Sequence, residues 1–231
     1  MRPPPKKALR APILPAALEP QELTRIDGAE LESCRLDACA LANQSGDRAR
    51  FDGVRIVGGT LSATKLTHLT WVDVLCEKCD LSMIEWHEAK LTRVEFRECR
   101  VTGAKLATGE LDHVRFVECQ LDYASFSEAR LRESSFEGCQ LREADFTRAD
   151  LTGTSLLRCD LKGADFGGAK LSRVDVSTSS LNEIRIGADV SDPRIGGSWS
   201  PTLPPRGWSR PSRERSRTGR RGAAPDSPAV R

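Results

Sequence analysis

The stretch that decides the fold runs from Val117 to Phe146 and reads VECQLDYASFSEARLRESSFEGCQLREADF. It superposes a short period on a long one. Cys119 and Cys139 lie twenty residues apart, and Gln-Leu follows each of them. Between and beyond them an apolar residue returns at every fifth position, namely Leu121, Phe126, Leu131, Phe136, Leu141 and Phe146. The fold of this chain has to satisfy both periods at once.

The five-residue register continues from Ile26 to Ile186 without an insertion, and we call its apolar positions centres. Only two centres, Gly46 and Cys76, are not Leu, Ile, Val, Phe or Trp. Two residues before each centre the side chain is mostly small, and seven of the eight cysteines occupy this small position. Because Gly46 places no side chain in the core, we expect a bulge or an irregular turn there.

A period of five fits neither a helix nor a flat strand. On an α-helix five residues turn by about 500°, so the centres would share no buried face. On a strand, positions an odd number apart point to opposite sides. The centres can all be buried only if the chain turns a corner once in every five residues. Four such units, or twenty residues, then close one turn of a square coil.

A coil of this kind stacks equivalent residues of successive turns in columns, about 4.8 Å apart. The sequence therefore predicts an all-β fold, a quadrilateral parallel β-helix of about eight turns over residues 24–188. Residues 1–23 are expected to cap its start, and residues 189–231 to form a disordered, basic tail. The predicted core columns contain Cys79, Cys99, Cys119, Cys139 and Cys159, then Phe96, Phe116 and Phe136, and then Phe126, Phe146 and Phe166.

At this point the chain resembles the pentapeptide-repeat proteins. Its units ADFTR, ADLTG and ADFGG follow the pattern small-x-Leu/Phe-x-x of that family. The resemblance covers about residues 24–188 and implies a right-handed coil. It also implies a non-enzymatic function. The best-known members are DNA mimics, which bind DNA gyrase or another type II topoisomerase and protect it from poisons.

Charge weakens the comparison with DNA. Residues 21–192 hold 30 acidic and 22 basic side chains, a net of −8, and no face of the square exceeds a net of −2. Duplex DNA of the same length would carry roughly twenty negative charges. If the rod is a mimic, the acidic side chains beside Trp86 should form the partner surface: Glu85, Glu88, Glu128, Asp145 and Asp165. The rival interpretation is a scaffold or interaction module with an unidentified protein partner.

The C-terminal segment is basic, because residues 193–231 hold nine arginines against Glu214 and Asp226, a net of +7. Three interpretations are open: a solvated extension, which we favour, a nucleic-acid-binding tail, or a tail that lies on the acidic rod. A frameshifted terminus would give a similar composition, and an intact mass would reveal it. The segment lacks helical apolar spacing, so it does not support a dimer through this end.

Catalytic and metal-binding motifs find no support. The pair Cys76 and Cys79 in CEKC has a redox or zinc spacing, but the repeat already accounts for both residues. The three histidines occupy outward positions, and His68 is expected to stack on Glu88. We therefore expect no enzyme activity, no cofactor and no metal. No apolar run reaches the ~20 residues of a membrane span, and Arg10 and three prolines interrupt the N-terminal apolar residues, so we expect a cytoplasmic protein.

Overall fold

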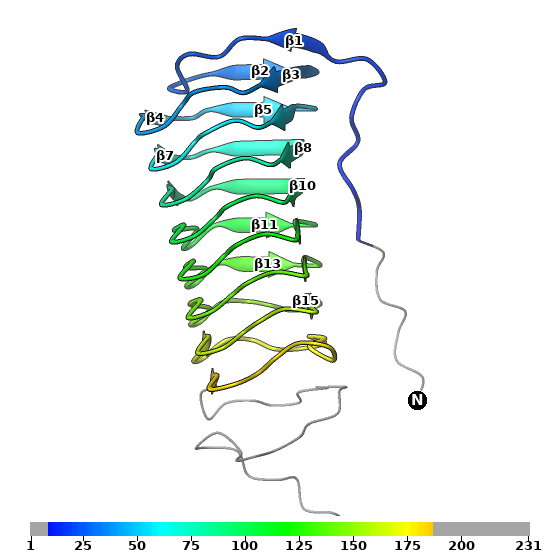
Figure 1. Cartoon of the computed structure of the whole chain (residues 1–231), viewed down its shortest axis with the longest axis vertical. Coiled ribbons are helices and arrows are strands. Elements are labelled where there is room, and N and C mark those ends of the chain that lie inside the picture. The colour runs from blue at the N-terminus through cyan, green and yellow to red at the C-terminus, as the bar shows by residue number, and fades with distance from the viewer. Residues whose placement is uncertain (1–8, 187–231) are drawn as a thin grey trace, which may run out of the picture.

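The computed structural model describes residues 9–186, which form a single rod of stacked turns (Figure 1). The described part of the chain consists of short strands, corners and loops, without a helix. Its strands are β1 (Glu19–Gln21), β2 (Glu30–Glu32), β3 (Cys34–Asp37), β4 (Ser45–Asp47), β5 (Arg50–Asp52), β6 (Arg55–Val57), β7 (Lys65–Thr67), β8 (Thr70–Glu77), β9 (Glu85–His87), β10 (Lys90–Arg97), β11 (Glu110–Asp112), β12 (Arg115–Val117), β13 (Arg130–Arg132), β14 (Ser135–Glu137), β15 (Ser155–Leu157), β16 (Asp165–Phe166) and β17 (Arg185–Ile186).

Every strand pair within the repeats is parallel and joins residues twenty positions apart. Phe96 of β10 pairs with Phe116 of β12, and Phe116 pairs in turn with Phe136 of β14. Single bridges continue the same offset where no strand is formed, as between Gln120 and Gln140. The prediction of a parallel β-helix with about eight turns of twenty residues is therefore confirmed.

The corners are made by backbone in the left-handed region, two residues after a centre. Glu118, Tyr123 and Glu128 have φ of 53°, 60° and 60°. Side chains usually avoid this region. Here the amide of each corner residue donates to a carbonyl of the next turn, as Tyr123 N does to Arg142 O at 2.9 Å. The stacking of turns thus stabilises a conformation that one isolated corner would not hold.

The interior is dry and its aromatic rings stack along the rod. The centroids of Phe96 and Phe116 lie 4.8 Å apart, and those of Phe116 and Phe136 lie 4.9 Å apart. A second column joins Phe126 to Phe146 at 5.2 Å, and Phe146 to Phe166 at 5.0 Å. Rings of the two columns also meet edge to face. Phe116 and Phe146 therefore stack on a ring of the turn before and on a ring of the turn after.

The thiols form a further buried column. The exposed fractions of Cys79, Cys99, Cys119, Cys139 and Cys159 lie between 1% and 3%. Each sulfur lies within hydrogen-bonding distance of two carbonyl oxygens, and Cys119 Sγ donates to Phe96 O and Val117 O at 3.4 Å. Gly59 takes the small position of this column between Cys39 and Cys79, and a Cβ there would lie 2.6 Å from Cys39 Sγ. At that turn the column therefore has no room for a side chain larger than that of glycine.

A double-mutant cycle tests this packing. We expect Gly59→Ala to lower the free energy of unfolding by about 1–3 kcal/mol, because the added methyl group meets the buried Cys39 thiol. In the Cys39→Ala background the same change should cost less, since the clashing sulfur is gone. Urea denaturation of the four proteins gives the coupling energy. Equal losses in both backgrounds would contradict the close approach of the two side chains.

The prediction of a bulge at Gly46 is wrong. Gly46 lies in the regular strand β4 and pairs with Leu66 of β7. The reason for glycine is a close approach of the first turn, because a Cβ on Gly46 would lie 2.6 Å from the Cα of Asp27. Asp27 is itself tied to this turn, since its Oδ1 accepts a hydrogen bond from Asp47 N at 3.0 Å.

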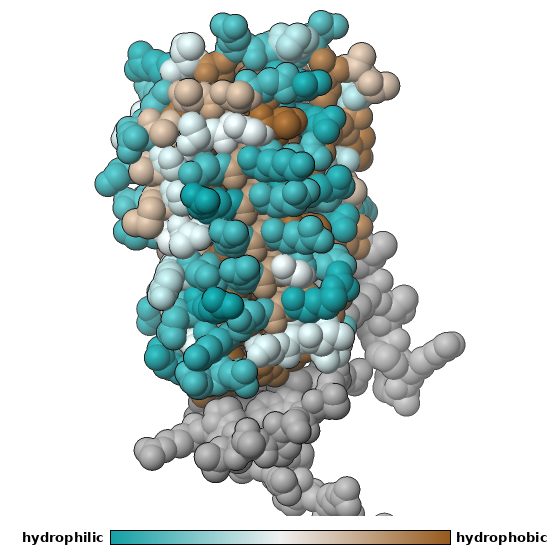
Figure 2. Space-filling model, viewed as in Figure 1, coloured by the Kyte–Doolittle hydropathy of each residue, from teal (hydrophilic) through white to brown (hydrophobic). Residues whose placement is uncertain are grey.

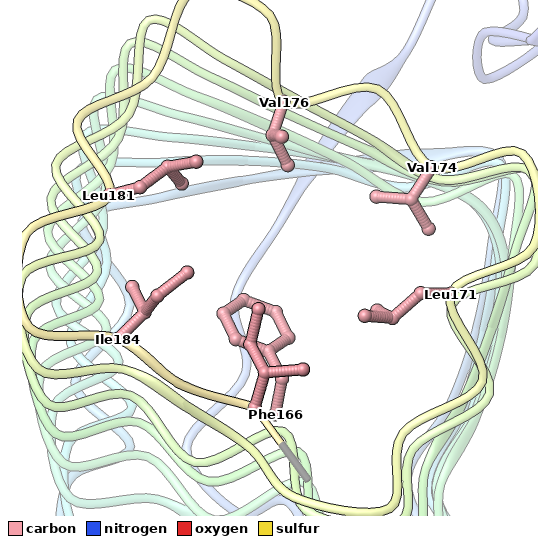
Figure 3. A pocket seen from close by; sticks show the side chains of 7 residues that line it. Phe166, Leu171, Val174, Val176, Leu181 and Ile184 are labelled. Atoms are coloured by element: carbon pink, nitrogen blue, oxygen red, sulfur yellow. The ribbon is translucent and has the colours of Figure 1, made fainter. Parts of the chain in front are cut away.

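The two ends of the rod differ. At the start, β1 pairs with β3 at an offset of fifteen residues, outside the repeat, and covers the first turn (Figure 1). Residues 9–18, which precede β1 in the chain, lie along the side of the rod (Figure 1). At the other end the interior opens into a pocket lined by apolar side chains, with Phe166 at its floor (Figure 3). The lining residues are Phe166, Leu171, Val174, Val176, Leu181, Ile184 and Ile186. The predicted basic tail lies outside the described residues.

Candidate interaction surface

The five acidic residues singled out from the sequence lie along one side of the rod. Successive turns place Lys65, Glu85, Lys105, Ser125, Asp145, Asp165 and Arg185 in one column. Glu88 and Glu128 occupy the corner that follows this column, both at positive φ. The acidic groups thus share one side, but basic residues alternate with them.

Most of these carboxylates are neutralised by a neighbouring turn. Glu85 lies between two lysines, with Lys105 Nζ at 3.1 Å and Lys65 Nζ at 3.5 Å. The hydrogen bond from Lys105 is the main reason why the pKa of Glu85 is below its usual value. Further ion pairs join Glu128 to Arg148 at 2.8 Å and Asp165 to Arg185 at 3.8 Å.

Glu88 faces a histidine. His68 Nε2 lies 3.3 Å from Glu88, and His68 Nδ1 lies 2.8 Å from Asp47 Oδ1. The hydrogen bond to Asp47 raises the pKa of His68 above its ordinary value of 6.5. Because the folded pKa is the higher one, this contact contributes most at low pH and is lost as pH rises through that pKa. The predicted stacking of His68 on Glu88 is confirmed, in a fully solvated setting.

The same charge pairing covers other sides. Glu95 is almost fully buried, at 1% exposure, and contacts Arg97 and Arg115. Asp73 and Arg93 form a bidentate pair with distances of 2.7 and 2.6 Å. On the face shown in Figure 2, hydrophilic side chains form vertical rows over the stacked strands. A surface that pairs its charges between turns has no continuous acidic stripe like that of DNA.

One corner of the rod departs from this pattern, and we call it the uncharged corner: Met83, Gly103 and Tyr123 on three successive turns. Met83 is 59% exposed and Tyr123 is 67% exposed, and they are the only exposed large hydrophobic side chains within the repeats, residues 24–186. A Cβ on Gly103 would lie 2.6 Å from Met83 Sδ, so Met83 lies over the glycine. The preceding positions are Ser82 and Thr102, which are small and uncharged, and Asp122.

Sequence reasoning missed this corner, although a signal was present. Met83 and Tyr123 are two turns apart at the same corner position, and large apolar side chains are rare at the other corners. Four outward apolar side chains on a different face are only half-buried, namely Val57, Leu75, Val117 and Leu157. The uncharged corner adjoins Glu85 directly, because only the inward Ile84 separates residues 83 and 85.

The thiols offer no accessible chemistry. All eight cysteines are free and buried. Burial raises the pKa of Cys39 to about 11, and it raises the pKa of Cys76 well above the usual value. Within residues 9–186 no group of three or more His, Cys, Asp or Glu side chains could hold a metal ion. The CEKC pair is thus part of the core.

One histidine differs from expectation. His113 occupies an outward position of the repeat, but it is only 4% exposed. Residues 9–18 cover it, and its Nδ1 accepts a hydrogen bond from Arg10 N at 3.3 Å. His113 thus occupies the outward corner position predicted for it, but it is hidden from solvent because residues 9–18, which stand outside the repeat, cover it.

Comparisons with known proteins agree with this architecture. A family model described as a pentapeptide repeat region matches residues 89–166. The search of curated proteins gives no match. Within residues 9–186, no helix has the length and apolar character needed to cross a membrane.

Solved structures of similar proteins include a trypsin-treated form of QnrB1, a plasmid-mediated fluoroquinolone resistance protein. The identity is 20%, the match covers 73% of this chain and 87% of QnrB1, and the TM-score is 0.33. HetL, a pentapeptide repeat protein involved in heterocyst differentiation regulation in the cyanobacterium Nostoc sp., is 19% identical over 71% of this chain and 89% of HetL, with a TM-score of 0.26. A pentapeptide repeat protein of the Arabidopsis thaliana thylakoid lumen is 17% identical over 41% of this chain and 60% of its own, with a TM-score of 0.31.

The matched region, residues 89–166, lies inside a five-residue register that continues on both sides of it and builds one coil of stacked turns. Its centres and its small positions fill the same dry interior from β3 to β16. Residues 89–166 are therefore a pentapeptide repeat region, and the same five-residue register extends it on both sides, from Ile26 to Ile186.

Proposed function

We propose that this chain is a non-catalytic binding module, a stiff rod that engages a protein partner in the cytoplasm. Its contact surface is the uncharged corner together with the adjoining side that carries Glu85, Glu88, Glu128, Asp145 and Asp165. The exposure of Met83 and Tyr123 on a surface otherwise covered by ion pairs is the observation that carries this proposal. Tyrosine and methionine are enriched in protein interfaces, where aromatic anchors supply much of the binding energy.

The alternative is a DNA mimic that binds DNA gyrase or another topoisomerase and confers resistance to a topoisomerase poison. A straight rod favours it. The pairing of Glu85, Glu128 and Asp165 with basic side chains disfavours it, since each pair removes a negative charge from the surface. A supercoiling and drug-cleavage assay with purified gyrase tests this alternative. No effect at micromolar concentration would eliminate it and leave the interaction module.

Site-specific photocrosslinking in the source cells tests the module. A crosslinking amino acid at Tyr123 should give a discrete adduct of fixed mass, and Met83→Ser in the same chain should remove it. The matched control carries the crosslinker at Glu118, an exposed residue at a different corner of the same turn. Adducts of equal intensity from both positions, or an adduct that ignores Met83→Ser, would contradict a contact at the uncharged corner.

A further inference from the structure

Residues 9–18, which we call the strap, follow the rod lengthwise and cover one of its corners. Pro15 lies over Gly53, where a Cβ would be 3.5 Å from Pro15 Cδ. Ile13 N donates to Asp73 Oδ1 at 2.9 Å, and Arg10 N donates to His113 Nδ1 at 3.3 Å. Gly53, Asp73 and His113 are corner residues of three turns of the rod. The strap therefore runs opposite to the direction in which the coil advances.

The covered corner, with Gly53, Asp73, Arg93 and His113, differs from its equivalents elsewhere. We call it the strap corner. Gly53, Asp73 and His113 are buried, and Arg93 is half-buried. On the next corner of the same turns, the equivalent residues Gly58, Lys78, Glu98 and Glu118 are all exposed. Burial at the strap corner thus comes from the strap and not from the repeat.

The spacing of the two hydrogen bonds matches an extended chain. Asp73 and His113 are two turns apart, which is about 9.6 Å at the sheet spacing. Ile13 and Arg10 are three residues apart, which is about 10 Å in an extended backbone. The prolines at 12 and 15 favour that extended form. The two acceptors on the rod, Asp73 and His113, are therefore spaced to accept hydrogen bonds from two backbone N–H groups that lie three residues apart in an extended segment.

The groups beneath the strap are polar, which a simple cover would not require. Asp73 and Arg93 form their bidentate pair under it, and burial of such groups costs free energy unless their partners are well placed. Burial favours a higher pKa for Asp73, but the hydrogen bonds from Arg93 and Ile13 N outweigh it and lower that pKa. Acceptors aimed at backbone N–H groups are typical of peptide recognition.

Two further donors lie beside the strap corner. Arg115 Nε and Ser135 Oγ are buried, and neither has a hydrogen-bond partner in the described structure. Arg115 lies two residues after His113, and Ser135 pairs with it on the next turn. Both can donate to peptide carbonyl groups. They lie on the turn of His113 and on the turn that follows it.

The strap itself is held lightly. Between residues 9 and 18 its hydrogen bonds to described parts of the rod are those from Ile13 and Arg10, and the Ile13 side chain is 71% exposed. Segments with few buried contacts open at a low free-energy cost. Its covalent link to β1 nevertheless keeps it near the site at an effective concentration of order mM.

We propose that the strap corner is a binding site for an extended, proline-containing apolar segment of a partner protein, and that the strap occupies this site in cis. The partner segment would supply N–H groups to Asp73 and His113, three residues apart, and a proline against Gly53. The site lies two sides of the square away from the uncharged corner, so it does not depend on the function proposed above.

The test removes the N–H group of Ile13 twice, first from the strap of the protein and then from a peptide that competes with the strap. The probe is a fluorescent peptide with the sequence of residues 9–18, LRAPILPAAL. The protein is the full chain with Ile13→Pro, which removes the strap's donor to Asp73 and leaves every residue of the site unchanged. Fluorescence anisotropy should show that this variant binds the peptide at least about tenfold more tightly than the wild-type chain, because its site is open more often.

The same peptide with an N-methyl group on its isoleucine should bind the Ile13→Pro variant about tenfold more weakly, since it lacks the same N–H. Asp73→Asn in that variant should weaken the unmodified peptide. Equal, non-saturating binding by the wild-type chain and the variant, or binding that ignores N-methylation, would overturn the proposal and leave the strap a fixed cover. Circular dichroism confirms that each variant keeps its strands. Photocrosslinking at Tyr123 is unaffected by either outcome.

Discussion

Phe116→Ala is expected to lower the free energy of unfolding by about 3–5 kcal/mol, the range for a large aromatic side chain lost from a core. Phe116 is fully buried and stacks on both sides, against Phe96 at 4.8 Å and Phe136 at 4.9 Å. Its edge-to-face contact with Phe126 is lost as well. The surrounding turns are fixed by backbone hydrogen bonds, so the cavity cannot collapse. Guanidinium denaturation followed by circular dichroism measures the loss.

Phe166→Ala provides the matched control. Phe166 stacks on one ring only, Phe146 at 5.0 Å, and on its other side lie Ile186, its partner in β17, and the apolar pocket at the end of the rod (Figure 3). Because a solenoid is stabilised by contacts between neighbouring turns, loss of the ring with one stacked ring neighbour should cost clearly less than loss of the ring with two. Equal losses for the two variants would show that the ring columns do not carry the stability assigned to them.

The repeat itself could be predicted because one physical requirement fixes it. A centre every fifth residue is buried only in a square coil, and an offset of twenty residues then sets every strand pair, including Phe96 with Phe116. The backbone conformation of the corners was harder to predict from the sequence. Glu118, Tyr123 and Glu128 adopt positive φ, although glycine and asparagine are the residues that usually indicate it. Their conformation comes from hydrogen bonds to the next turn, which local sequence does not reveal.

The surface was harder to predict than the core. The offset of twenty residues does place Lys65, Glu85 and Lys105 in one column, so their ion pairs were within reach of the sequence. The strap was not. Its contacts join Ile13 to Asp73 and Arg10 to His113, across 60 and 103 residues, and no period relates them. Tertiary contacts outside the repeat decided which corner is buried and which histidine is hidden.

Gly46→Leu is expected to destabilise the rod by ~3 kcal/mol, the upper part of the range for an overfilled core. The sequence pattern suggests the opposite, because leucine is the commonest residue at a centre. Leucine would stabilise the rod if position 46 bordered a void, and it would destabilise the rod if residue 46 had a positive φ, but neither condition holds here. Gly46 has ordinary strand backbone, and a Cβ would lie 2.6 Å from Asp27 Cα and 2.9 Å from Asp27 Cβ.

The first turn cannot move aside cheaply to admit the new side chain. Asp27 Oδ1 accepts a hydrogen bond from Asp47 N, and Gln44 holds Ile26 N at 2.9 Å and Thr24 O at 2.8 Å. Hydrogen exchange should therefore rise at the amides of residues 24–31 in Gly46→Leu, while urea denaturation reports the loss of stability. Ser45→Leu, an exposed position of the same strand, should change stability by less than about 0.5 kcal/mol. A gain in stability for Gly46→Leu would mean that the position is an unfilled void after all.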